Sequence, residues 1–275
     1  MTVLKNPLSL HHLTVKEIPP ADLVTIAAAV GCPQIGVFVT GPGRATDAYK
    51  MIQDEPTKRE VLARMADTGV TVHNLEVFAL RAKTNVEADF RRHLEMGAAL
   101  GAKRATVQKY DEDANRALDN FRALCALGDE YGIAMHIEFT GFQLLKTPAQ
   151  TLAFLDEAGV ANATVAVDFL HVYRTGGTPA DVAAIPPHRI GYIQINDGLI
   201  RDADFDSYLD EALEDRLIPG TGQFDLPALI ASMPGDVTID VECPSRRLIN
   251  EGKTPLERAR IAVEASRKFL GSRVG

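Results

Sequence analysis

The sequence contains no tryptophan, only three cysteines and no long apolar run. Cys32, Cys125 and Cys243 are widely spaced and include no CxxC pair, which argues against a disulfide framework and against a zinc finger. No apolar stretch reaches the roughly 18 residues that a membrane-spanning helix needs. Residues 1–15 lack the basic start and continuous apolar stretch of a signal peptide. We therefore expect a cytoplasmic protein whose thiols are reduced and buried.

Positive charge is also scarce. The chain has 29 lysines and arginines against 37 aspartates and glutamates, which gives a net charge of −8. No window gathers lysine and arginine into the basic surface that nucleic-acid phosphates or anionic lipids require. The composition therefore predicts neither a nucleic-acid partner nor a membrane partner.

Strand-like and helix-like segments alternate along the whole chain. Short apolar runs typical of buried parallel strands lie near residues 7–11, 34–39, 70–77, 104–108, 133–138, 163–168, 190–195 and 237–242. Amphipathic helix patterns lie near residues 20–31, 45–68, 85–100, 112–131, 148–159, 179–185, 203–215, 225–233 and 255–270. Six of the seven intervals between strand starts are about 27 to 36 residues, which fits one strand, one helix and two short loops.

The eight repeats predict an α/β protein with a single domain, a (β/α)8 TIM barrel over residues 1–275. The competing fold is a doubly wound open sheet, which normally carries a glycine-rich phosphate loop after its first strand. Neither GxGxxG nor GxxxxGKS/T occurs in this chain. Glycines between a helix pattern and the next strand also fit the repeat, because they are placed as helix C-caps: Gly31, Gly69, Gly101, Gly132 and Gly159.

Four polar residues each end a predicted strand in the second half of the chain. MHIE ends at Glu138, VAVD at Asp168, GYIQ at Gln194 and IDVE at Glu242. In a parallel barrel the carboxyl ends of the strands meet on one face, where active sites lie. Three carboxylates and an amide that converge there would repel one another unless a cation neutralised them. The pattern predicts a shared divalent-metal site, and its oxygen donors favour Mn²⁺, Mg²⁺ or a similar ion over structural zinc.

Other polar residues lie close to these strand ends. His136 and Asp240 come two residues before the two strand-end glutamates, so we expect them one layer deeper as buried structural groups. His171 follows Asp168 by three residues, and from the loop after the strand it can lean over the site and move protons. Arg216 lies in the segment RLIPGTGQFD, whose rigid loop can hold it toward a polar substrate.

These segments resemble the xylose-isomerase-like superfamily of sugar phosphate isomerases and epimerases. GIAMHIEF is similar to the strand-five glutamate motif and VAVDFLHVYRTGG to the Asp-x-x-His motif. DRLIPGTGQFDL is similar to the arginine-containing PGxGxxD loop, and IDVECP to the closing strand with its glutamate. The resemblance implies a barrel with one divalent ion at its mouth, commonly manganese, magnesium or cobalt, while zinc is also allowed.

Carried over to the matching positions, the resemblance implies that Glu138, Asp168, Gln194 and Glu242 are the metal ligands. Glu138 and Glu242 would also form the acid–base pair on opposite faces of the substrate. His171 and Arg216 would contact the substrate. The implied activity is that of an isomerase or epimerase, which removes a proton next to a metal-bound carbonyl of a small hydroxylated compound that is sugar- or cyclitol-like.

Gln194 departs from the epimerase pattern, because epimerases of this superfamily commonly carry histidine there. A glutamine is similar to the 3-dehydroshikimate dehydratases, which are lyases that eliminate water and use the histidine of the Asp-x-x-His motif as their base. The second strand, QIGVFVT, lacks the glutamate expected of that group. Isomerase and lyase both remain open, beside a non-catalytic binding barrel. An abasic-site endonuclease is disfavoured by the net charge of −8 and by the single histidine near the site motifs.

Substrate recognition depends on the loops after the first four strands. We take Glu76 and Lys109 as substrate-binding residues beside His171 and Arg216. Three further candidates for this pocket are His11, His12 and Arg44. The expected partner is a small polyhydroxy carbonyl compound, with or without a phosphate or carboxylate group. Barrels of this superfamily are often dimers or tetramers, so a homo-oligomer is also left open.

Overall fold

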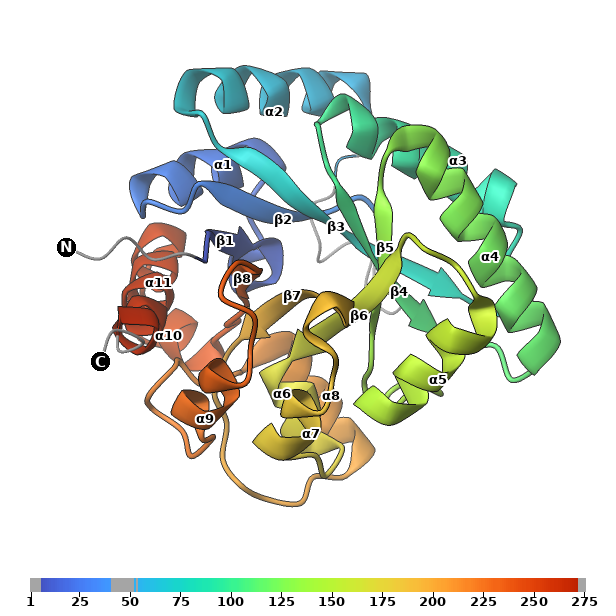
Figure 1. The fold of residues 1–275 in the computed structure, drawn as a ribbon. Coiled ribbons are helices and arrows are strands. Elements are labelled where there is room, and N and C mark those ends of the chain that lie inside the picture. The colour runs from blue at the N-terminus through green and yellow to red at the C-terminus, as the bar shows by residue number, and fades with distance from the viewer. Residues whose placement is uncertain (1–5, 41–51, 53, 272–275) are drawn as a thin grey trace.

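Eight parallel strands close into a barrel in the computed structural model, which describes residues 6–40, 52 and 54–271 (Figure 1). The strands are β1 (Leu8–His11), β2 (Gln34–Phe38), β3 (Thr71–Leu80), β4 (Arg104–Lys109), β5 (Ala134–Glu138), β6 (Ala163–Asp168), β7 (Ile190–Ile195) and β8 (Thr238–Val241). Each strand pairs with the next in sequence, and β8 pairs with β1 to close the ring. The predicted (β/α)8 barrel is confirmed.

Helices surround the strands on the outside of the barrel (Figure 1). They are α1 (Pro20–Ala29), α2 (Glu55–Thr68), α3 (Val86–Ala99), α4 (Ala114–Tyr131), α5 (Pro148–Ala158), α6 (Phe169–Arg174), α7 (Pro179–Ala183), α8 (Phe205–Glu214), α9 (Leu226–Ala231), α10 (Arg246–Asn250) and α11 (Pro255–Gly271). Residues 45–51 of the helix predicted over 45–68 lie outside the described residues. The sequence did not predict α6 and α10, because segments of six and five residues are too short to show a helical period. None of the helices in the described ranges is long and apolar enough to cross a membrane.

The apolar core lies between the strands and the helices. Because side chains alternate along a strand, Leu10, Ile137 and Val167 face outward from the barrel, where they are fully buried under the helices. The helices end where the sequence predicted, since all five of the predicted C-cap glycines have positive φ, a conformation that glycine adopts without steric cost.

The inside of the barrel is unusually polar. A second inward row comes two residues before the strand ends and consists of Ser9, Asn74, Thr106, His136, Tyr192 and Asp240, all of them buried. The Tyr192 hydroxyl lies 2.5 Å from Thr106 Oγ1, and Asn74 Nδ2 donates to the same oxygen over 2.8 Å. His136 and Asp240 therefore lie deeper than the strand ends, as the alternation predicted. TIM barrels more often fill this space with branched apolar side chains.

Two adjacent histidines at the end of β1 face different surroundings. His11 closes the strand, and a 3-10 turn (His12–Val15) begins at the next residue. His12 is fully buried, and its Nε2 lies 3.0 Å from the carbonyl oxygen of Ile18. Burial lowers the pKa of His12 to about 4.

We predict that His12 makes the folded state less stable in acid. The unfolded chain binds a proton at this residue near pH 6.5, whereas the folded chain binds it only near pH 4, so stability is lost as pH falls between these values. Between pH 7 and pH 4 the free energy of unfolding of the wild type should fall by about 3 kcal/mol more than that of His12→Gln, as measured by urea unfolding. The other buried histidines are common to both proteins, so their effects cancel. Equal losses in the two proteins would contradict the prediction.

Candidate active site

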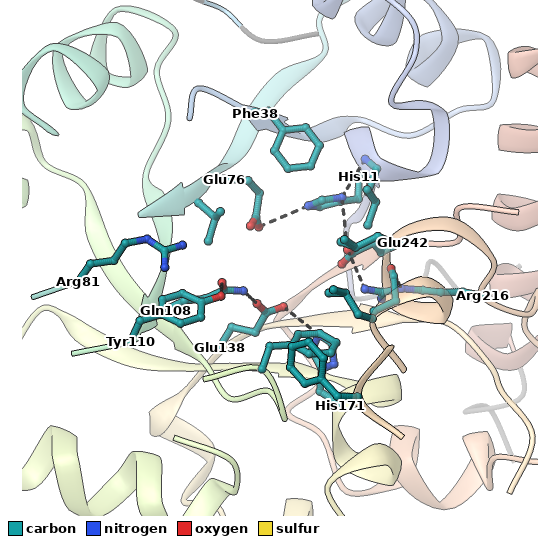
Figure 2. Close-up of a pocket in the computed structure, with 17 residues that line it drawn as sticks. His11, Phe38, Glu76, Arg81, Gln108, Tyr110, Glu138, His171, Arg216 and Glu242 are labelled. Atoms are coloured by element: carbon teal, nitrogen blue, oxygen red, sulfur yellow. Dashed lines mark hydrogen bonds and ion pairs between the residues drawn. The ribbon is translucent and has the colours of Figure 1, made fainter. Parts of the chain in front are cut away.

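A cavity of about 480 Å³ opens at the carboxyl ends of the strands, and Figure 2 shows the side chains that converge on it. Six of the residues predicted from the sequence line it: His11, Glu76, Glu138, His171, Arg216 and Glu242. Arg81 and Tyr110 lie on one side of the cavity, and Arg216 and Glu242 on the other (Figure 2). Arg44 lies outside the described residues.

Asp168 and His171 are positioned by the start of α6. Asp168 ends β6, and its Oδ1 caps the helix by accepting hydrogen bonds from the backbone N–H groups of Leu170 and His171. His171 therefore lies on a short helix and not on a loop, which corrects the prediction. Its Nδ1 is 2.6 Å from the Tyr208 hydroxyl, and its Nε2 is 3.7 Å from Glu138 Oε1.

Arg216 joins two of the predicted metal ligands. It is almost fully buried, with Nη1 2.6 Å from Asp168 Oδ2 and Nη2 3.1 Å from Glu242 Oε1. Burial alone would raise the pKa of Asp168, but Arg216 and then His171 lower it overall. Burial raises the pKa of Glu242 to about 7 even though Arg216 opposes the shift. One guanidinium thus offsets part of the repulsion between two buried carboxylates.

Glu138 is held by residues that the sequence analysis missed. Gln108 Nε2 donates to Glu138 Oε2 over 2.5 Å, and the Tyr110 hydroxyl donates to Gln108 Oε1 over 2.6 Å. Burial, together with the charges of Glu76, Glu242 and Asp168, raises the pKa of Glu138 well above its ordinary value. Gln108 could have been identified, because it is an inward-facing amide near the end of a strand, as Gln194 is.

His11 lies between two carboxylates of the cavity. Its Nε2 is 3.4 Å from Glu76 Oε1, and its Nδ1 is 3.8 Å from Glu242 Oε1. Burial opposes protonation, but Glu242, Asp240 and Glu76 together raise the pKa of His11 to about 10. In the neutral ring Nδ1 accepts the backbone N–H of Leu13 over 3.1 Å, which leaves the Nε2 proton facing Glu76.

Lys109 does not line the cavity, which corrects its prediction as a substrate-binding residue. It follows Gln108 on β4, so the alternation of side chains turns it away from the barrel interior. Its ammonium donates a hydrogen bond of 2.7 Å to the backbone carbonyl of Asp111. His12 is likewise buried away from the cavity.

Asp197 fixes the loop that follows Arg216. Leu217 pairs with Asp197 through two backbone hydrogen bonds. The buried Asp197 carboxylate also accepts backbone N–H groups of the loop at 2.9 to 3.1 Å, namely those of Gly220, Gly222 and Phe224. This carboxylate holds the loop in one conformation and so restricts the backbone position of Arg216, which precedes the loop.

The family model for xylose isomerase-like TIM barrels matches residues 24–269. The chain belongs to this family. A comparison with curated proteins gave no match. Among solved structures, this member of the family is similar to an IolI protein with a bound zinc atom (17% identity, 97% of this chain and 98% of that chain, TM-score 0.76). It is also similar to the D-allulose 3-epimerase of Methylomonas sp. in complex with D-allulose (17% identity, 98% and 97% covered, TM-score 0.71).

A third similar structure is a fusion of a xylose isomerase-like barrel with a 4-hydroxyphenylpyruvate dioxygenase, at 18% identity and a TM-score of 0.77. The match covers 98% of this chain but only 43% of the longer fusion protein. At these identities the three likenesses show the shared fold.

The residues at the mouth of this xylose isomerase-like barrel fit a metal ion. Glu138, Asp168 and His171 each offer one ligand atom, and these atoms all lie within 4.8 Å of one another. Among the described residues, the buried Gln194 Oε1 and Glu242 Oε2 have no hydrogen-bond partner. Buried oxygens without a partner are costly unless a donor or a cation satisfies them. These five side chains form a donor set that could hold one divalent ion.

Asp197→Asn should destabilise the protein. The amide keeps one acceptor oxygen but replaces the other with an N–H group, which faces the loop's backbone donors. We expect the free energy of unfolding to fall by about 2 to 4 kcal/mol in urea titrations. The exposed Asp22→Asn on α1 is the matched control and should change it by less than about 0.5 kcal/mol. If both variants behave alike, the carboxylate does not fix the loop.

Proposed function

We propose that this barrel is a divalent-metal-dependent isomerase or epimerase of a small hydroxylated carbonyl compound. One observation carries the proposal: Glu138 from β5 and Glu242 after β8 reach the same cavity from different sides of the barrel. A substrate between them can lose a proton to one carboxylate and receive a proton from the other. The similar epimerase structures agree with this chemistry.

Each residue has a proposed role. Glu138, Asp168, Gln194 and Glu242 are the proposed ligands, and the divalent ion supplies positive charge that polarises a substrate carbonyl when it is bound. Mn²⁺, Mg²⁺ and Co²⁺ suit the oxygen donors of these four ligands, and Zn²⁺ is a further choice. With a metal bound, Arg216 and His171 are placed to donate hydrogen bonds to substrate oxygens, and Glu76 to accept one.

The walls of the cavity favour a substrate with an apolar face. One apolar part of the lining consists of Leu13, Phe38 and Val77. A second apolar part consists of Phe142, Phe205, Leu209 and Leu213. Aromatic and aliphatic walls suit the C–H face of a ring better than an extended polyol chain. We therefore propose a cyclic, cyclitol-like substrate.

A lyase of the 3-dehydroshikimate-dehydratase type is the second candidate function. Gln194 favours it, as does a cation at the rim of the cavity. The Arg81 guanidinium lies 4.3 Å over the Tyr110 ring and forms no ion pair within the described residues. It is available for a substrate carboxylate.

Metal analysis tests the proposed ligands. Wild-type protein dialysed with Mn²⁺ and then against buffer should retain about one equivalent by mass spectrometry. Glu138→Ala, Asp168→Ala and Glu242→Ala should each bind the ion at least about tenfold more weakly, whereas Gln194→His should retain it. Glu157→Ala, on the exposed side of α5, is the control. Full metal retention in all three alanine variants would rule out this ligand set.

Proton exchange tests the proposed chemistry. Ketoses, inososes and cyclic hydroxy-ketoacids incubated with the enzyme in D₂O should take up deuterium next to the carbonyl, as followed by NMR. Glu138→Gln and Glu242→Gln should slow the exchange about 10²- to 10⁴-fold, whereas Glu157→Gln should not. An isomeric product supports the isomerase. A new ultraviolet absorbance from a conjugated alkene, formed in step with substrate loss, would instead identify the lyase.

A further inference from the structure

A second cavity lies at the opposite end of the barrel, where the strands begin. Its volume is about 560 Å³, and residues at or next to the starts of β4 to β8 line it. Its polar lining consists of Lys103, Arg104, His136, Thr164, His188 and Asp236. Lys103 and Arg104 carry positive charge and Asp236 carries negative charge, while burial lowers the pKa of His136 to about 3 and so keeps its ring neutral.

Arg104 is the central cation of this cavity. It begins β4 and lies on the same face as Thr106 and Gln108, so it points into the lower end of the barrel. The side chain is half-buried, and burial lowers the pKa of its guanidinium. No carboxylate of the described residues lies within 4.0 Å of it, and its polar contact is His73 Nδ1 at 3.4 Å. A partly desolvated guanidinium without an anion nearby is unfavourable, so this position favours an anionic ligand.

The rest of the lining supports the same ligand chemistry. Lys103 adds a second positive charge at the rim. Among the described residues, Asp236 is the one carboxylate that lines the cavity, and neither Lys103 nor Arg104 forms an ion pair with it. Thr164 adds a hydroxyl group, which is hydrogen-bonded to His136 Nδ1. A fork-shaped guanidinium and a point-charge ammonium at one cavity are typical of oxyanion recognition.

Gly191 keeps the floor of this cavity open. A Cβ atom at this position would collide with the imidazole of His136 and the hydroxyl of Thr164. Because residue 191 has no side chain, these two polar groups remain part of the cavity lining. The absence of a side chain thus leaves room beside Arg104 that a larger residue would fill.

We propose that the cavity at the amino ends of the strands binds a small oxyanion of the phosphate class, with Arg104 as its main contact and Lys103 as its second. The ligand is inorganic phosphate or the phosphoryl group of a small metabolite. This site is separate from the mouth of the barrel and does not depend on the function proposed for the mouth.

Isothermal titration with inorganic phosphate tests the proposal on the purified full chain in a chloride buffer at pH 7.5. We expect one saturable site, with affinity reduced at least about tenfold in Arg104→Gln and about threefold in Lys103→Gln. Arg260→Gln, an exposed residue of α11, is the matched control and should bind as the wild type does. Melting temperatures of all variants establish that they are folded. Because Lys103 is exposed, Lys103→Gln should fold as the wild type does. It therefore tests the site even if Arg104→Gln fails to fold.

Three results would overturn the proposal: no saturable binding to the wild type, unchanged binding in both cavity variants, or binding lost in Arg81→Gln. The last result would place the phosphate at the barrel mouth. A parallel titration with glycerol 1-phosphate separates the two ligand sources. Binding tighter than that of inorganic phosphate indicates a phosphorylated metabolite, and weaker binding indicates the free ion.

Discussion

The contact of Arg216 with Asp168 and Glu242 governs the architecture of the barrel mouth. Burial and the charges of the other carboxylates at the mouth raise the pKa of Glu138, and the planar guanidinium of Arg216 meets two of those carboxylates at once. The position of Arg216 depends in turn on Ala212, whose carbonyl accepts its Nε–H, and on the loop that Asp197 ties down. The charge balance of the site is therefore set by a residue from outside the strands.

The sequence predicted the parts of this structure that depend on the spacing of the strands and on the alternation of side chains along them. Apolar runs at regular intervals located all eight strands, and alternation placed Glu138 and Glu242 at the mouth with His136 and Asp240 below them. Lys109 was misplaced because it lies one position out of phase with Gln108, and β4 continues through both residues. Tyr208 could not be found in this way, since α8 brings it to His171 only through tertiary packing.

The two ends of the barrel are joined by its second inward row. The Tyr192 hydroxyl lies 3.3 Å from Glu76 Oε1 at the mouth, and the Tyr192 ring packs against His136 with their centroids 5.7 Å apart. His136 also lines the cavity at the strand starts. A polar path of side chains therefore runs along the axis where other barrels have aliphatic layers.

Because the axis of the barrel is polar, the two faces of each strand have different roles. The outward faces, with residues such as Val37, Met135 and Ile193, supply the apolar burial that keeps the chain folded. The inward faces carry buried polar side chains that are hydrogen-bonded to one another, so a change at one of them also affects its partners. Substitutions of these inward side chains can therefore change which ligands the barrel binds, while the apolar core between strands and helices stays the same.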